Sequence, residues 1–171
     1  MSIYPDFRDK EHRDAFFREV SRLVGEKLPE EMRNFNDATT PGNNWMTLRY
    51  KNRLPNVSYE FQFATERSKQ HEPYFGSGDK TVLALYYDNL ALRDVWLQAM
   101  KLYKSRIEDQ LGEEVVLGLW GEGKGYVILG KKLDSQTLGV EPEGYANEIV
   151  RFIQATFQEV GIVNEKAKGN P

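Results

Sequence analysis

Three acidic or amide side chains of this chain could together hold a metal ion. Glu60 and Gln62 stand two residues apart in a run of alternating apolar and polar residues, and Asp88 follows the next apolar run. Positions i and i+2 of a β-strand point to the same face, which brings the first two side chains together. Oxygen ligands of this kind bind Mg²⁺ and position water for attack on a phosphodiester. The set predicts, as one alternative, an active or degenerate Mg²⁺-dependent nuclease.

Glu60-Phe61-Gln62 resembles a variant of the motif of restriction-endonuclease-like enzymes, but the motif is incomplete in this chain. Such enzymes carry a carboxylate on one strand and an acid-x-Lys tripeptide on the next, and no lysine stands two residues after Glu60. Glu122-Gly123-Lys124 has the right residue types, but the glycines around it predict a hairpin turn. Polar residues on a solvated sheet face are therefore the favoured interpretation, and the metal site remains the alternative.

Cations and an aromatic ring share one face of another predicted strand. Trp45, Arg49 and Lys51 lie an even number of positions apart in residues 45–51, so they share one face of a strand. A face of this kind could follow a phosphate backbone and stack a base. The same residues could instead form a solvated face, with Glu60 paired across a hairpin. The chain as a whole is not basic, so the solvated face is the favoured interpretation and the nucleic-acid face the alternative.

A long polar connector, residues 66–78, carries the remaining candidates. Loops of this length are often functional, and this one contains Lys69, His71, Tyr74 and Phe75. The two aromatic residues could form an exposed contact patch or cover the sheet edge. His71 and His12 could act as general bases, but no catalytic partner accompanies either at a known spacing, so both are expected to be surface histidines.

The elements that must position these residues centre on residues 79–120. The apolar run at 81–87 predicts a central strand, and apolar residues at three- and four-residue steps over 92–111 predict an amphipathic helix that Gly112 ends. A further strand follows at 115–120. Asp88 or Asn89 could cap the helix between the two strands.

The remaining elements are arranged around this unit. A helix with its apolar face over 16–28 is predicted to start at Asp6 or Asp9 and to end at Pro29, and strands at 45–51 and 57–65 form a hairpin. A strand at 126–130 and a helix from Pro142 to Gly161 complete the chain. The fold class is α+β, a two-layer sandwich of about five mostly antiparallel strands covered by three helices in the order α-βββ-α-ββ-α. Residues 1–163 would form a single domain and residues 164–171 a disordered tail.

Composition limits the function classes. The chain has 171 residues, 40% of them hydrophobic, with a formal net charge of −3 and no cysteine. The absence of cysteine excludes disulfides, thiolate metal sites and cysteine nucleophiles. The mild charge gives no global reason to bind nucleic acid or an anionic membrane. Without an apolar run of membrane-spanning length or an apolar signal core, we expect a soluble cytoplasmic protein.

The central unit resembles an uncharacterised prokaryotic domain family, a domain of unknown function often found at the C-terminal end of nuclease- or defence-related proteins. The shared features are an apolar strand ending in tyrosine, a long helix closing on Ile107-Glu108 and Leu111-Gly112, a strand with Trp120, and a final helix with Phe152 and Phe157. The resemblance covers about residues 45–160. It implies an accessory or recognition role near nucleic-acid-processing systems, and no catalytic residues.

The leading prediction is a non-catalytic binding or regulatory module, with no cofactor and with a protein or nucleic acid as partner. Its contact surface would combine residues of the hairpin face with residues of the long connector: Trp45, Arg49, Lys51, Lys69, His71, Tyr74 and Phe75. The alternative is the Mg²⁺-dependent nuclease described above.

Overall fold

A computed structural model describes residues 9–64, 69–121, 125–134, 138 and 141–169. The described residues form four α-helices and six strands, together with two 3₁₀ turns. In chain order the elements are α1 (Lys10–Lys27), η1 (Glu30–Met32), β1 (Asn36–Asp37), β2 (Trp45–Arg49), β3 (Val57–Ala64), η2 (Lys69–His71), α2 (Glu72–Phe75), β4 (Lys80–Tyr87), α3 (Arg93–Leu111), β5 (Val116–Trp120), β6 (Tyr126–Leu133) and α5 (Pro142–Ala167).

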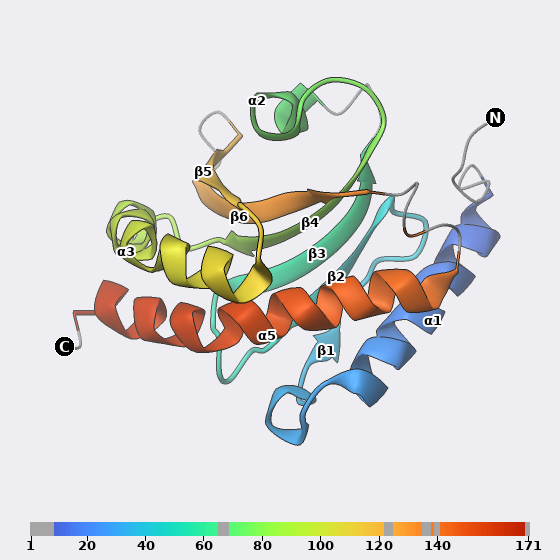
Figure 1. The fold of residues 1–171 in the computed structure, drawn as a ribbon, viewed down its shortest axis with the longest axis horizontal. Helices are drawn as coiled ribbons and strands as arrows, with labels where there is room; N and C mark the ends of the chain where they lie inside the picture. The colour runs from blue at the N-terminus through green and yellow to red at the C-terminus, as the bar shows by residue number, and fades with distance from the viewer. Residues whose placement is uncertain (1–8, 65–68, 122–124, 135–137, 139–140, 170–171) are drawn as a thin grey trace.

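The strands form one open sheet in the order β1-β2-β3-β4-β6-β5, and every neighbouring pair is antiparallel. Helices α1, α3 and α5 lie against one face, called here the helix face, while α2 lies over the opposite, outer face (Figure 1). The predicted α+β class and antiparallel pairing are confirmed. The prediction of five strands and three helices is wrong in count, because β1 and α2 are too short to leave a periodic signal in the sequence.

Local signals set most element ends. Asp9 caps α1 by accepting a 3.0 Å hydrogen bond from the Glu11 amide, and the helix stops two residues before Pro29. Gly112 ends α3 with φ of 71°, a left-handed conformation that a glycine adopts without steric cost. Asn89 accepts a 3.2 Å hydrogen bond from the Leu92 amide, so it tightens the turn before α3, which begins at Arg93.

The main core lies between the helix face and the three long helices. Trp96 of α3 is fully buried and stacks on Tyr87 of β4, with ring centroids 4.7 Å apart. The indole N–H of Trp96 donates a 2.7 Å hydrogen bond to the carbonyl oxygen of the Asn164 side chain. The Asn164 amide in turn donates to the Pro55 carbonyl oxygen at 3.2 Å, which joins α5 to the turn between β2 and β3.

Helix α5 is longer than the sequence predicts. The predicted end at Gly161 is wrong, because the helix continues to Ala167. Val160, Val163 and Ala167 are all buried, so apolar packing continues past the glycine. A single glycine inside a helix costs only about 1 kcal/mol, and this packing outweighs it. Residues 164–167, which the sequence assigns to a tail, form the last turn of the helix.

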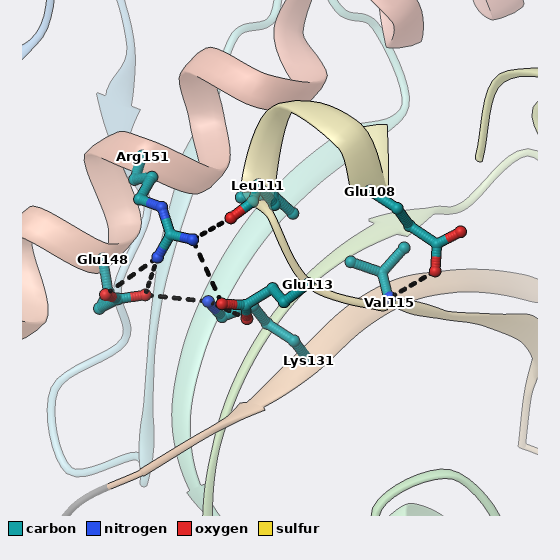
Figure 2. Close-up of polar contacts among 7 residues, drawn as sticks. All are labelled: Glu108, Leu111, Glu113, Val115, Lys131, Glu148 and Arg151. Carbon is teal, nitrogen blue, oxygen red and sulfur yellow. Dashed lines mark hydrogen bonds and ion pairs between the residues drawn. The ribbon is translucent and has the colours of Figure 1, made fainter. Parts of the chain in front are cut away.

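Strand β6 also exceeds its predicted bounds and carries a lysine into the core. Lys131 has only 5% of its side chain exposed and pairs with Glu113, and its ammonium group lies 2.9 Å from the Glu148 carboxylate. Arg151 of α5 bridges the same two glutamates and also donates to the Leu111 carbonyl oxygen (Figure 2). This polar network joins the end of α3, β6 and α5.

None of the helices in the described part of the chain is long and apolar enough to span a lipid bilayer.

Candidate functional site: a pocket on the outer face

The outer face carries a pocket of about 540 Å³ beside α2. Helix α2 packs over β4, β6 and β5 through a second apolar cluster that includes Phe75, Tyr86 and Trp120, and the pocket opens where that cover stops, over β2 and β3. A volume of this size is typical of ligand-binding sites. The pocket is lined by Asn44, Trp45, Arg49, Ser58, Glu60, Gln62, Phe63, Ala64, Lys69, Gln70, His71, Tyr86, Asp88, Trp120 and Tyr126.

The strand register explains how these side chains meet. Residues 58, 60 and 62 of β3 point to the outer face, and their neighbours on β2 are Arg49, Thr47 and Trp45. On the other side of β3, Tyr86 of β4 is paired with Ser58. Strands lie about 4.8 Å apart, so side chains that rise from β2 and β4 flank a slot about 10 Å wide, with β3 as its floor.

The segment η2–α2 closes one end of the pocket. The imidazole of His71 is buried and lies 4.5 Å from the Trp120 ring, measured between centroids. Tyr74 lies over Gly118, where an added Cβ would come within 2.6 Å of the tyrosine ring, and its hydroxyl donates to the Leu119 carbonyl oxygen. Tyr74 and the buried Phe75 therefore cover the sheet, which is one of the two roles that the sequence left open.

Glu60 lies on the pocket floor in an unusual electrostatic environment. Burial raises the pKa of its carboxyl to about 7, because the charged form loses contact with water. The nearby Arg49 guanidinium and a hydrogen bond from the Thr47 hydroxyl act in the opposite direction and lower the pKa. Desolvation prevails, so near neutral pH this group exchanges between a carboxylate and a neutral acid.

Gln62 and Tyr86 form a buried polar pair beside Glu60. The Gln62 amide donates a 2.8 Å hydrogen bond to the Tyr86 hydroxyl oxygen. Burial raises the pKa of Tyr86, and the negative charge of Glu60 raises it further. The phenol therefore stays protonated, and since its oxygen accepts from Gln62, its own proton can be donated to another group.

The pocket rim has a different character from its floor. Arg49, Lys69 and Asp88 are exposed, and the Lys69 ammonium lies 3.0 Å from the Glu72 carboxylate. Trp45 stands at one side with 38% of its surface exposed, and Tyr126 stands with Trp120 at the other side. The rim thus offers cations and aromatic rings, while the floor offers a carboxyl, an amide and a hydroxyl group.

The structure brings two separately predicted sets of residues into one site. Trp45, Arg49, Lys69 and His71 from the predicted contact surface line the same pocket as the alternative metal set of Glu60, Gln62 and Asp88. Lys51 lies in the turn after β2, outside the lining, and Tyr74 and Phe75 lie in α2. The expectation that His71 is a surface histidine is wrong, because only 5% of the residue is exposed.

The aromatic wall of the site is not among the predicted site residues. Tyr86 lies in the apolar run predicted as a central strand and Trp120 in the strand after it; both residues are nearly covered, and each also lines the pocket. The strand alternation of residues 81–87 contained the signal, since Tyr86 shares its face with Val82 and Ala84 rather than with the main core.

The three residues of the metal alternative line this pocket, but the register places no further ligand beside Glu60. Across the strands, the direct neighbours of Glu60 are Thr47 and Ala84, so the register sets no lysine or second acid beside it. Among the residues that the structure describes, no group of three or more His, Cys, Asp or Glu side chains could hold a metal ion. The Glu122-Gly123-Lys124 tripeptide lies outside the described residues.

Comparison of the chain with protein-family models, with curated protein sequences and with solved structures finds no match.

Proposed function

We propose that this chain is a binding module for single-stranded nucleic acid, which it takes up on the outer face of the sheet with a base entering the pocket. The observation that carries the proposal is the layered chemistry of the pocket. Planar rings flank it, exposed cations lie at its rim, and neutral or acidic hydrogen-bonding groups form its floor. A nucleotide has the complementary order, with a phosphate outside and a polar base edge inside.

Stacking supplies the first part of the expected affinity. Trp45 rises from β2 on one side of the slot, and Tyr86, backed by Trp120, rises on the other. Base stacking on an aromatic side chain contributes about 1–3 kcal/mol per base and tolerates any sequence. A double-stranded ligand would keep its bases stacked on one another and present no free base face, so the pocket favours a single strand.

The second part of the expected affinity comes from phosphate contacts, which are few. Arg49 and Lys69 are the exposed cations of the pocket lining, and the exposed carboxylate of Asp88 opposes them. With about two phosphate contacts, the logarithm of the binding constant should fall with the logarithm of salt concentration with a slope of about −1.4 for a single strand. The net charge of −3 of the whole chain also predicts modest rather than tight binding.

Fluorescence anisotropy of short labelled homopolymers, both DNA and RNA, tests the proposal. Arg49→Ala and Trp45→Ala should each weaken binding at least about fivefold, and Arg49→Ala should also reduce the salt slope by about half. Arg18→Ala is the matched control, since Arg18 is exposed on α1, away from the outer face. Absence of binding to every single strand, or equal losses for Arg18→Ala and Arg49→Ala, would overturn the proposal and leave a protein partner as the better hypothesis.

A second candidate is the Mg²⁺-dependent nuclease, because Glu60, Gln62 and Asp88 all line the pocket. Incubation of the chain with single-stranded and plasmid DNA in Mg²⁺ or Mn²⁺ separates the two. Metal-dependent cleavage that Glu60→Gln abolishes would establish the nuclease. Binding without cleavage in the same reactions would establish the module.

A further inference from the structure

We infer that Glu60 makes the pocket selective for guanine within the bound strand. The inference rests on the proposed function and names the base that the floor would recognise. It follows from three observations: the position of Glu60 on the floor, the hydrogen bonds already used by its neighbours, and the charges that face it.

Glu60 occupies the centre of the outward-pointing residues of β3, between Ser58 and Gln62. A base that stacks against Trp45 enters the slot with its ring plane upright and its hydrogen-bonding edge toward the floor. Trp45 is paired with Gln62, and Glu60 is the next outward-pointing residue of β3, so the edge lies over the amide of Gln62 and the carboxyl group of Glu60. Selectivity depends on which pattern of donors and acceptors that edge presents.

An ionised carboxylate offers two adjacent acceptors and no donor. Among the bases, guanine alone presents two adjacent donors on its Watson–Crick edge, the imino N1–H and the exocyclic N2 amino group, and can satisfy both oxygens at once. Adenine and cytosine present one donor beside an acceptor nitrogen, which would face the second carboxylate oxygen unfavourably. Each well-formed bidentate contact of this kind discriminates by about 1–3 kcal/mol against the wrong base.

Among the residues that the structure describes, one hydroxyl donor and one nearby cation act on this acceptor pair. The Thr47 hydroxyl supplies one hydrogen bond to the carboxyl, and the Gln62 amide donates to Tyr86. The charged or titratable groups that share the pocket are Arg49, Lys69, His71, Asp88 and the two tyrosines. Arg49 is the described cation whose charge lowers the pKa of Glu60. A desolvated carboxylate with one hydroxyl partner gains most from a ligand that brings two donors.

The Tyr86 hydroxyl completes the recognition. It accepts from Gln62, so its proton is directed away from that residue and can be donated to an acceptor of the ligand. Guanine carries such an acceptor, O6, next to its N1–H group. Donors to O6 and acceptors for N1–H and N2–H are thus both available within the pocket lining.

The test uses thymidine oligonucleotides with one central guanosine, inosine, adenosine or cytidine, at about pH 8, one unit above the pKa of Glu60. The guanosine strand should bind about tenfold more tightly than the adenosine and cytidine strands. Inosine lacks the N2 amino group and should bind with intermediate affinity. In Glu60→Gln the side chain offers one donor and one acceptor, so guanosine should bind no more tightly than adenosine and cytidine.

Glu114→Gln is the matched control, because Glu114 is exposed and lies outside the pocket. This variant should keep the wild-type order of affinity, in which the guanosine strand binds most tightly, the inosine strand less tightly and the adenosine strand least. Equal affinity for all four strands, or an unchanged order in Glu60→Gln, overturns the guanine inference while the binding module stands. If the wild-type chain binds none of the strands, the proposed function on which the inference rests is overturned.

Discussion

The Gln62 carboxamide donates a 2.8 Å hydrogen bond to the Tyr86 hydroxyl, although the two residues are not paired across their strands. The register pairs Gln62 with Val82 and Tyr86 with Ser58, so the two side chains lean toward each other above the Glu60–Ala84 pair. The small side chain of Ala84 leaves room for this contact. The hydrogen bond therefore fixes the wall of the pocket next to Glu60.

Tyr86→Phe should remove this contact and leave the Gln62 amide without its buried acceptor. Leaving one buried donor unsatisfied costs about 1–3 kcal/mol, so the free energy of unfolding in urea should fall by about that amount. Tyr126→Phe provides the control, since Tyr126 is 37% exposed and its hydroxyl can bond to water. Equal stability of the two variants would show that the Gln62–Tyr86 bond contributes nothing to the fold.

Glu60 should make the protein less stable as the pH rises toward neutrality. Its pKa is about 7 in the folded chain and 4.5 when exposed, so between these values the folded state holds a proton that the unfolded state has released. The stabilising contribution is complete below pH 4.5 and is lost as the pH rises through about 7. A difference of one in pKa between the folded and unfolded chain corresponds to about 1.4 kcal/mol, so the loss in unfolding free energy is on the order of 3 kcal/mol.

Urea unfolding between pH 4.5 and about 8 measures this effect in the wild type and in Glu60→Gln. The difference in stability between the two proteins should shift in favour of the glutamine variant as the pH rises, because glutamine does not ionise. Glu114→Gln should follow the wild type throughout. A constant difference between wild type and Glu60→Gln would mean that the carboxyl of Glu60 titrates as an exposed group.

Sequence patterns identified the long elements and missed the short ones. Helices α1 and α3 and the hairpin of β2 and β3 repeat their apolar residues with clear periods. The end of α3 at Gly112 agrees with the prediction, and the cap of α1 is Asp9, one of the two residues that the sequence offers. Helix α2 has only four residues, too few for a period, so the burial of His71 beneath it had no signal. The end of α5 was misjudged because a glycine suggests a stop, whereas the packing of Val163 lies in the tertiary structure.

The candidate site was predictable residue by residue but not as one pocket. The two-residue alternation of strand side chains indicates that Trp45, Arg49, Glu60 and Gln62 are outward-facing residues. Their proximity to Lys69, His71 and Trp120 depends on where η2 lies and on the pairing of β6 between β4 and β5. Neither property can be read from local spacing, because both follow from contacts between residues far apart in the chain.

Asn164 should be a major determinant of stability although it lies beyond Gly161. Its side chain is 3% exposed and accepts the hydrogen bond from the fully buried Trp96 indole. Asn164→Ala would leave that N–H group without its acceptor and the Pro55 carbonyl without its donor, at a cost of about 2–4 kcal/mol. Gln158→Ala, an exposed change on the same helix, should cost less than about 0.5 kcal/mol. Thermal and urea unfolding compare the two, and similar stabilities would mean that residues beyond Gly161 do not belong to the cooperative fold.

Lys131 should be held in the core by its two glutamate partners, and its removal should cost stability in a pH-dependent way (Figure 2). Lys131→Met leaves Glu113 and Glu148 with Arg151 alone. Breaking a buried ion pair typically costs about 3–5 kcal/mol, and because both glutamates are partly exposed we expect about 2 kcal/mol. Lys132→Met is the matched control, since the next residue of β6 is exposed on the outer face and should tolerate the change.

The acid side of the pH profile distinguishes this ionic network from simple packing by the lysine stem. Burial alone would raise the pKa of Glu113, but the hydrogen bond and charge of Lys131, with a smaller effect from Arg151, lower it below 4.5. A lowered pKa gives stability that is present above pH 4.5 and is lost as the pH falls through the value in the folded state. The wild type should therefore lose stability on acidification in this range, and Lys131→Met should lose less. Parallel acid profiles for the two proteins would show that Lys131 stabilises the fold through its apolar stem and not through its charge.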